Sequence, residues 1–434
     1  MSGRARVIVP LAVAAAVAVG AFALMGSLAP PPRNGLPTPT PPDTAATQGP
    51  PLPEPSPTPR PGLGGTELYG YLPYWQMNGA VAEHLRSTPV TTLALFSVSA
   101  RRNGSLNPNP TGYRRITSDV GRRLIREAHD RGARVELVFT SFGPVRNGRF
   151  FGRLPGSGAT PAPGGTAIAS TDSTASPAPT PPPWQRTVRE LVDLAVELGV
   201  DGINVDVERL DPLDRGAYGA FLTALRAALR EARADAQVSV ATEAGERGVA
   251  NAAVAAAAGV DRIFLMGYDY HWSGSPPGAS APVDRLDGIA TLRWSIERYV
   301  EAGVPRDRIF LGLPLYGMRW RTLGPDRFSP VVGDGIAWLP NENLETLTDP
   351  AFASTHDPVE VAEWFAVEDG DEWLITYYDT PATLRSKLAL ARDQGLAGGG
   401  FWALGYTRGL PGYGDLMDAF VSGDVAREEA PPPP

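Results

Sequence analysis

Three polar side chains alternate with aliphatic ones in the segment Asp201–Glu208, at a spacing that suits acid–base chemistry. The strict alternation predicts a β-strand, because successive side chains of a strand point to opposite faces. Asn204, Asp206 and Glu208 therefore share one face. A buried strand of a parallel sheet is normally apolar on both faces, so three polar groups on one face indicate a functional site. The structural alternatives are an edge strand with a wet face and a buried salt-bridge network.

The two carboxylates of this segment suit proton transfer. Asp206 would disfavour ionisation of Glu208, and burial would act in the same direction. Both effects raise the pKa of Glu208, which is therefore expected to keep a proton near neutral pH. No cofactor is expected, since the chain has no Walker-type loop and no dinucleotide fingerprint. No metal site is expected either, because metal-ligand spacing is missing from the four histidines, His84, His129, His271 and His356.

The elements that must position these residues recur along the chain. Eight segments have the composition and length of strands. They are Leu68–Trp75, Thr91–Val98, Ala133–Thr140, Val200–Asp206, Ala236–Ala241, Arg262–Tyr268, Ile309–Leu315 and Gly398–Leu404. Five amphipathic helical patterns lie between them, at Asp119–Arg131, Gln185–Leu198, Arg215–Ala234, Leu286–Ala302 and Pro381–Gln394. This alternation predicts an α/β fold, a (β/α)8 TIM barrel with catalytic groups at the C-terminal ends of its strands.

The first 62 residues of the chain are not expected to belong to the barrel. In residues 1–29, Arg4 and Arg6 precede a long apolar run, which indicates export as either a cleaved signal peptide or an uncleaved membrane anchor. Both alternatives place the rest of the chain outside the cytoplasm. Residues 30–62 are rich in Pro and Thr and are expected to form a disordered, semi-extended spacer.

The barrel is expected to occupy residues 63–425, with two interruptions. Residues 154–183 consist almost entirely of Gly, Pro, Ala, Ser and Thr and predict a disordered insertion. Residues 321–373 separate the seventh strand from the eighth and predict a small α+β insertion. Residues 426–434 form an acidic and Pro-rich tail that is expected to be disordered.

Charge and cysteine content exclude several functional classes. The net charge of −8 argues against a nucleic-acid partner or an anionic membrane surface, because both call for basic patches. The chain has no cysteine, so disulfides and thiol chemistry are excluded. A monomer is expected.

The segment Asp201–Glu208 resembles the DGxDxDxE signature of glycoside hydrolase family 18, the chitinase-like enzymes. Asn204 stands where most members have the first Asp, and this substitution resembles the branch of N-acetylglucosaminidases that lyse peptidoglycan and spore cortex. Four more segments are similar to the family's first, sixth, seventh and eighth strands. They are Tyr69–Trp75, Leu265–His271, Leu311–Gly317 and Gly400–Gly405.

Glycoside cleavage needs a proton donor for the leaving oxygen and a group that stabilises the charge developing at the anomeric carbon. Glu208 is the candidate donor. Asp206 points the same way from roughly 7 Å along the strand, so it is poorly placed to attack from the opposite side of the sugar. The resemblance implies that the 2-acetamido group of an N-acetylated sugar is the nucleophile. In that mechanism Asp206 would hold the acetamido N–H and Tyr268 would donate to the acetamido oxygen.

The resemblance also implies substrate-binding residues. Asp269 would shape the subsite or contact hydroxyls, Asn204 stands beside the catalytic pair, and Trp402 matches the tryptophan that floors the sugar site. Packing in the barrel core is the alternative for Trp402. Tyr71 and Tyr316 lie at strand ends, where a subsite contact and packing within the barrel layers are equally open.

The sequence therefore predicts an exported glycoside hydrolase that cleaves a β-1,4-linked polysaccharide containing N-acetylglucosamine. Asn204 and the stalked arrangement favour peptidoglycan over chitin, although no wall-binding module accompanies the barrel. The alternative is a catalytically silent, lectin-like barrel that binds carbohydrate. Such barrels usually lack the terminal acid, whereas this chain retains Glu208.

Overall fold

The computed structural model describes residues 66–154 and 181–424. The expectations for residues 1–29, 30–62 and 426–434, and for nearly all of 154–183, therefore lie outside the described residues. Within the described ranges, no helix is both long and apolar enough to cross a bilayer.

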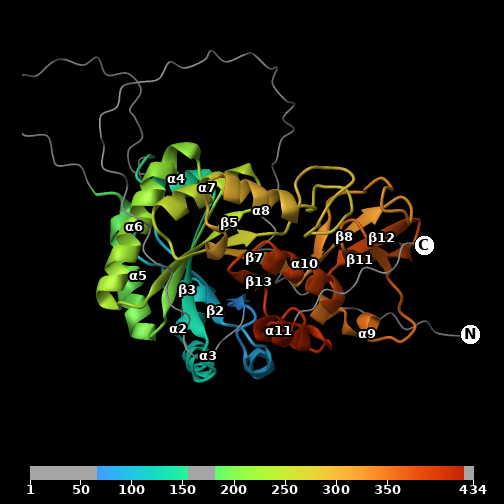
Figure 1. Ribbon diagram of the computed structural model, residues 1–434, viewed down its shortest axis with the longest axis horizontal. Coiled ribbons are helices and arrows are strands. Elements are labelled where there is room, and N and C mark those ends of the chain that lie inside the picture. Colours follow the sequence, from blue (N-terminus) through green and yellow to red (C-terminus); the bar gives the residue numbers. More distant parts are fainter. Residues whose placement is uncertain (1–65, 155–180, 425–434) are drawn as a thin grey trace, which may run out of the picture.

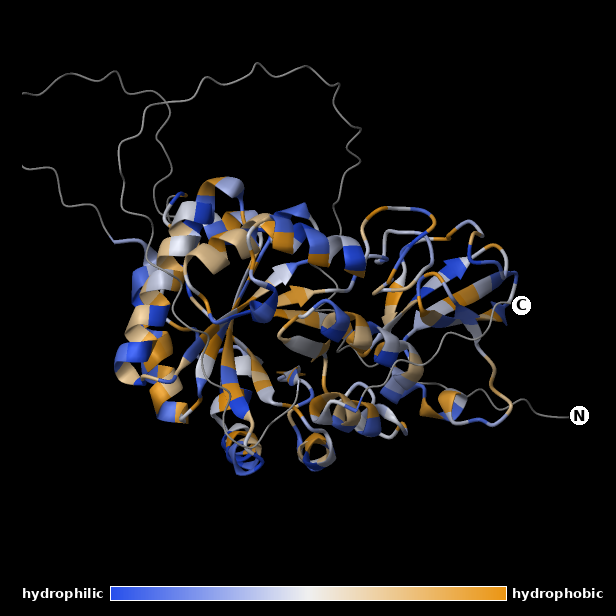
Figure 2. Ribbon diagram, viewed as in Figure 1, coloured by the Kyte–Doolittle hydropathy of each residue, from blue (hydrophilic) through white to orange (hydrophobic). Residues whose placement is uncertain are grey.

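Eight parallel strands close into a barrel in the order β1-β13-β7-β6-β5-β4-β3-β2. Their bounds are β1 (Glu67–Pro73), β2 (Thr92–Ser99), β3 (Arg134–Phe142), β4 (Gly202–Glu208), β5 (Gln237–Glu243), β6 (Arg262–Met266), β7 (Ile309–Pro314) and β13 (Gly398–Trp402). Each predicted strand is present, and the predicted TIM barrel is confirmed. The strands are largely apolar, and the helices around them carry both apolar and polar residues (Figure 2), as expected for helices that pack on a sheet.

Helices surround this barrel (Figure 1). Their bounds are α1 (Gly79–His84), α2 (Thr111–Thr117), α3 (Asp119–Asp130), α4 (Pro144–Phe150), α5 (Pro183–Leu198), α6 (Arg215–Ala232), α7 (Glu246–Ala257), α8 (Leu292–Glu301), α10 (Pro381–Asp393) and α11 (Tyr413–Ser422). The prediction that α8 begins at Leu286 is wrong. Leu286 is 71% exposed in the preceding loop, and the side chain of Thr291 caps the helix by accepting a hydrogen bond from the Trp294 amide.

An antiparallel sheet is inserted between β7 and β13 and lies beside the barrel (Figure 1). It consists of β8 (Gly317–Thr322), β9 (Ile336–Trp338), β10 (Thr355–Asp357), β11 (Ala362–Asp369) and β12 (Glu372–Tyr378), with the short helix α9 (Leu344–Leu347) between β9 and β10. The predicted insertion is confirmed but is longer than residues 321–373, because β8 starts soon after the barrel strand ends. Its core packs Trp338 against Phe365 and Tyr378.

Three polar side chains tie neighbouring strands together where the strands begin. Each stands immediately before a barrel strand and accepts a hydrogen bond from a backbone amide of an adjacent strand. These residues are Thr91 before β2, Asp201 before β4 and Asp261 before β6. Burial by itself raises the pKa of Asp201, but hydrogen bonds from His129 and from the Val135 amide, with the positive charge of Arg233, bring it down to about 2. The aspartate of the Asp201-Gly202 turn is thus a structural anchor for β4.

We expect Asp201→Asn to lower the free energy of unfolding by about 2 kcal/mol near pH 7, because a depressed carboxyl pKa stabilises the folded protein above the pKa of the unfolded chain. The difference from the unsubstituted protein should shrink as the pH falls from about 4 toward 2. Denaturant unfolding at a series of pH values measures it, with Asp130→Asn on an exposed position as the control. A loss of stability that does not vary with pH would contradict the assignment.

Candidate active site

Three carboxylates meet at the C-terminal ends of adjacent strands. Asp206 and Glu208 are on β4, and Glu243 is the last residue of β5. Asp206 is 4% exposed, whereas Glu208 and Glu243 are partly buried. The barrel therefore brings together the predicted acid pair and adds a third acid to it. Glu243 Oε1 accepts a hydrogen bond from the Arg209 amide at 2.8 Å.

Burial and the charge of neighbouring carboxylates both disfavour the ionised forms of Asp206 and Glu208. Burial raises the pKa of Asp206 to about 8, and the negative charge of Glu243 adds to the effect. Burial also raises the pKa of Glu208 well above its ordinary value, with contributions from Asp206, Glu243 and Asp269. Because the groups are coupled, Asp206 and Glu208 together retain at least one proton at neutral pH. This is the condition that a general acid requires.

A chain of hydrogen bonds crosses the barrel interior close to Asp206. The Tyr71 hydroxyl donates to Asn204 Oδ1 at 3.1 Å, Asn204 Nδ2 donates to Ser239 Oγ at 2.8 Å, and Ser239 donates to Glu136 at 2.5 Å. Tyr69 donates to the same carboxylate at 2.6 Å. Burial raises the pKa of Glu136 to about 7, although these donors lower it in part. These hydrogen bonds hold the inner face of β4 against β1, β3 and β5.

This chain of hydrogen bonds includes two residues that the sequence named as candidates for substrate binding. Asn204 is 0% exposed and Tyr71 is 2% exposed, and each is bonded to the other. For Tyr71 this burial agrees with the second of the two open alternatives, packing within the barrel layers, and the substrate-binding role of both residues stays a prediction. Sequence reasoning missed Ser239 and Glu136. The signal was present, because each is a polar residue between two aliphatic ones in its strand.

The segment after β6 contributes a phenol and a fourth carboxyl. Tyr268 makes no side-chain hydrogen bond to the residues that the structure describes, and its ring lies 6.2 Å from that of Tyr316. Asp269 has a left-handed backbone (φ 60°), and its amide donates to Ser280 Oγ at 3.0 Å. Its carboxylate accepts a 2.5 Å hydrogen bond from Tyr316, while burial raises its pKa to about 6. The Tyr268 hydroxyl is thus available to a ligand, whereas Asp269 and Tyr316 satisfy each other.

An aromatic group lies on the opposite side of the mouth, at the end of β13. The partly exposed Trp402 packs edge-on against Phe96 at 4.8 Å between ring centroids, and against Tyr71 and Trp75 at 5.5 and 6.3 Å. Trp75 is 39% exposed. Exposed aromatic surface of this kind suits the apolar face of a sugar ring. The partial exposure of Trp402 argues against the alternative that it only fills the core.

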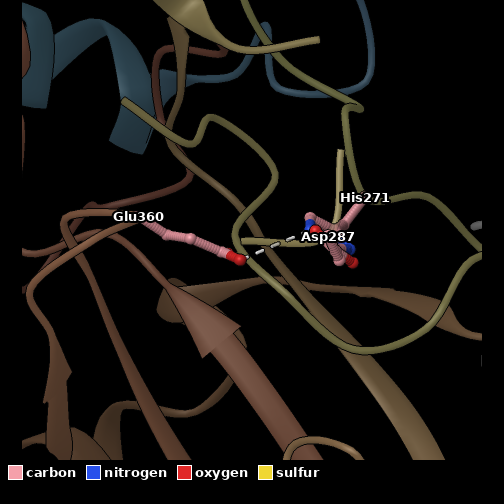
Figure 3. A group of neighbouring side chains, drawn as sticks. All are labelled: His271, Asp287 and Glu360. Atoms are coloured by element: carbon pink, nitrogen blue, oxygen red, sulfur yellow. Dashed lines mark ion pairs between the residues drawn. The ribbon is translucent and has the colours of Figure 1, made fainter. Parts of the chain in front are cut away.

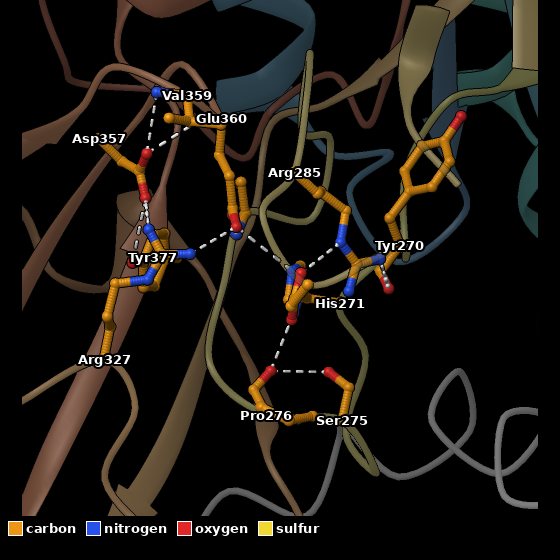
Figure 4. Close-up of polar contacts among 12 residues, drawn as sticks. Tyr270, His271, Ser275, Pro276, Arg285, Arg327, Asp357, Val359, Glu360 and Tyr377 are labelled. Carbon is orange, nitrogen blue, oxygen red and sulfur yellow. Dashed lines mark hydrogen bonds and ion pairs between the residues drawn. The ribbon is translucent and has the colours of Figure 1, made fainter. Parts of the chain in front are cut away.

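Buried ion pairs tie the loop after β6 to the inserted sheet. His271 directs Nε2 toward Glu360 at 3.5 Å, and both side chains are 0% exposed. Glu360 also accepts hydrogen bonds from the Ala279 amide at 2.5 Å and from Arg327 at 2.8 Å (Figure 4). Arg327 pairs with Asp357 on β10 as well. The inserted sheet therefore braces the loop that carries Tyr268 and Asp269.

Part of this network has the dimensions of a metal site. Ligand atoms of His271, Asp287 and Glu360 all lie within 4.8 Å of one another (Figure 3). However, Arg285 pairs with Asp287 at 3.0 Å, and Arg327 pairs with Glu360. Two guanidinium groups beside the carboxylates oppose the binding of a divalent cation. The geometry is that of an ion-pair network, and the expected absence of a metal stays a prediction.

We expect Asp206→Asn to change how stability depends on pH. A raised carboxyl pKa means that the folded protein binds the proton more tightly than the unfolded chain does, so stability falls as the pH rises from about 4 to about 8. The variant lacks this penalty. The free energy of unfolding of the variant minus that of the unsubstituted protein should therefore increase by more than about 1 kcal/mol between pH 5 and pH 8. Asp193→Asn, on an exposed position of α5, is the matched control. Parallel stability curves for Asp206→Asn and the unsubstituted protein would show that Asp206 ionises normally.

Comparisons with known proteins agree with this site. The family model described as glycosyl hydrolases family 18 matches residues 180–406. The putative sporulation-specific glycosylase YdhD of Bacillus subtilis is 32% identical over 145 residues, which is 32% of each protein. The cortical fragment-lytic enzyme of Bacillus subtilis is 27% identical over 328 residues, covering 73% of this chain and 65% of that enzyme. The chain thus spans between about a third and two thirds of the length of these curated relatives.

Solved structures show the same fold. The spore cortex-lytic enzyme SleL of Bacillus cereus superposes with a TM-score of 0.61 at 19% identity, covering 82% of this chain and 74% of that one. The family 18 chitinase of Cycas revoluta, solved in complex with (GlcNAc)3, gives a TM-score of 0.62 at 19% identity, covering 83% of this chain and 98% of that one. Since the family model matches more than half of the chain, including the strand with its acid pair, the chain belongs to glycosyl hydrolase family 18.

Proposed function

We propose that the protein is an exported glycoside hydrolase that cleaves β-1,4-linked polysaccharide containing N-acetylglucosamine. The observation that carries the proposal is the pair of acids on β4. Glu208 lies at the barrel mouth with a pKa raised by burial and by Asp206, and its carboxyl group makes no hydrogen bond to the described residues. A protonated, unengaged carboxyl at the end of a barrel strand is available to a leaving group.

In this proposal Glu208 gives its proton to the glycosidic oxygen as the bond from that oxygen to the anomeric carbon breaks. The acetamido carbonyl oxygen of the same sugar attacks the anomeric carbon from the other side and forms an oxazolinium ion. The carboxylate of Glu208 then removes a proton from water, which attacks the anomeric carbon and reopens the ring. Two inversions give a product with retained configuration.

Asp206 and Tyr268 are the residues that we propose stabilise the acetamido group as it attacks. Asp206 Oδ1 is buried and has no hydrogen-bond partner among the described residues, so it can accept from the acetamido N–H. The Tyr268 hydroxyl is similarly available to donate to the acetamido oxygen. Asn204 and Tyr71 support Asp206 from beneath, and Asp269 with Tyr316 orients the Tyr268 segment. Trp402 would stack on the sugar.

Two polymers fit this reaction, and we favour peptidoglycan over chitin. Asn204 replaces the first acid of the family signature, as in the cortex-lytic branch, and two relatives named above are a cortical fragment-lytic enzyme and a sporulation-specific glycosylase. Chitinases are also among the relatives, such as chitinase 63 of Streptomyces plicatus, 28% identical over 244 residues. Export, membrane anchorage and a monomeric state stay predictions.

The test is hydrolysis by the purified protein and by its Glu208→Gln variant, with Glu246→Gln on the exposed start of α7 as the control. Each is incubated with peptidoglycan and with chitin oligosaccharides, and mass spectrometry identifies the fragments. We expect new N-acetylglucosamine reducing ends from the unsubstituted protein and from the control. Glu208→Gln should lower the rate by at least about a hundred-fold, because the leaving oxygen loses its proton donor.

Two outcomes would contradict the proposal. Binding of either polymer without cleavage by the unsubstituted protein would make it a lectin-like barrel. Equal cleavage of a polymer whose sugars lack the N-acetyl group would exclude a nucleophile supplied by the substrate.

A further inference from the structure

A cavity of about 350 Å³ is lined in part by β3, the strand that pairs with β4, and none of the three acids of the mouth lines it. It lies between the end of β3, the turn after β2 and the helix α4. Its polar lining is dominated by arginines. These residues are Arg101, Arg102, Arg146 and Arg149, together with Asn107 and Ser141. The rest of its lining is apolar.

The charge of this arginine pocket is unusual for the chain as a whole. The protein carries a net charge of −8, yet none of the residues lining the pocket is acidic. Within the described residues, no carboxylate pairs with Arg101, Arg146 or Arg149. Displacement of water by the surrounding protein lowers the pKa of Arg146. Positive charges gathered in a concave site repel one another, and a bound anion would lower the free-energy cost of that repulsion.

Hydrogen bonds fix the turn that carries Arg101 and Arg102. The Arg101 amide donates to the Ser105 carbonyl at 2.7 Å, and Asn103 Oδ1 accepts from the Ser105 hydroxyl at 2.8 Å. Thr187 on α5 donates to the Gly104 carbonyl at 2.6 Å. The turn is therefore anchored at its tip.

The other wall of the pocket is fixed to the catalytic strand itself. Arg146 donates to the Ala100 carbonyl at 3.0 Å and so joins α4 to the turn. Asn147, the next residue, donates to the Glu208 carbonyl at 2.8 Å and accepts from Ser141 at 2.7 Å. The pocket thus has a fixed position relative to the proposed proton donor. Guanidinium groups are suited to carboxylates, which they bind through paired N–H donors.

We propose that the arginine pocket is a subsite for a carboxylate substituent of the polymer that is cut at Glu208. This inference rests on the proposed hydrolase function and deepens it. Chitin is neutral, whereas alternate sugars of peptidoglycan carry a lactyl group whose carboxyl is free or extended by an acidic stem peptide. A glycan lying across the mouth would place such a substituent over the rim. The pocket would then select peptidoglycan over chitin.

The test compares the double variant Arg101→Gln with Arg149→Gln against the double control Arg114→Gln with Arg115→Gln, which removes the same charge from exposed positions of α2. Arg146 is left in place because it bonds to the turn. The substrates are glycan strands with stem peptides, the same strands after an amidase has left only the lactyl carboxylate, and chitin oligosaccharides of equal length. We measure kcat/KM for each, and affinity for each in proteins that also carry Glu208→Gln.

We expect the double variant to lower the ratio of kcat/KM for carboxylate-bearing strands to that for chitin oligosaccharides by about ten-fold, and the affinity ratio likewise. The control should leave both ratios unchanged. A loss only with peptide-bearing strands identifies the stem peptide, and a loss with both strands identifies the lactyl group. Unchanged ratios in the double variant, or equal losses on chitin oligosaccharides, would contradict the proposed carboxylate subsite. The proposed hydrolase function would not be affected by that result. If affinity depends on the arginines but the unsubstituted protein cleaves none of the substrates, the proposed hydrolase function is contradicted and the carboxylate subsite is supported.

Discussion

The rest of the site depends on the cost of burying negative charge at the barrel mouth. Asp206, Glu208 and Glu243 lie on neighbouring strands. Burial is the largest cause of the raised pKa values of Asp206 and Glu208. Water would normally solvate such carboxylates, so the folded protein lowers the cost by keeping protons on Asp206 and Glu208. The same constraint that destabilises the free protein near neutral pH therefore prepares an acid for proton transfer. Stability is given up where the chemistry needs a protonated group.

The surroundings of these acids are organised to keep them in place. Beneath them, the chain of hydrogen bonds from Tyr71 through Asn204 and Ser239 to Glu136 gives each buried polar group a partner, which a barrel interior requires. Beside them, the inserted sheet braces the Tyr268 segment through Glu360. Among the groups that have no hydrogen-bond partner in the described residues are Asp206 Oδ1, the Glu208 carboxyl and the Tyr268 hydroxyl, and the proposed reaction uses all three.

Much of this could be predicted from local patterns. Period-two alternation identified the strand with Asp206 and Glu208, and the order of strands and helices identified the barrel. The predicted start of α8 was wrong because the loop before the helix also contains apolar residues. The hydrogen-bond partners of Asn204 and Tyr71 could not be predicted, because residues such as Ser239 are distant from them in the sequence. The arginine pocket was missed for the same reason, since Arg101 and Arg149 meet only when β2 and β3 pair.

The protonation state of Glu208 tests the central claim most directly. Carboxyl carbons of glutamate labelled with carbon-13 report ionisation in NMR spectra, and the spectrum of Glu208→Gln identifies the signal of Glu208. The account predicts that this signal stays at its protonated position through pH 7, because burial and the neighbouring acids raise the pKa of Glu208 well above its ordinary value. A signal that titrates near the ordinary glutamate value of about 4.3 would contradict the account.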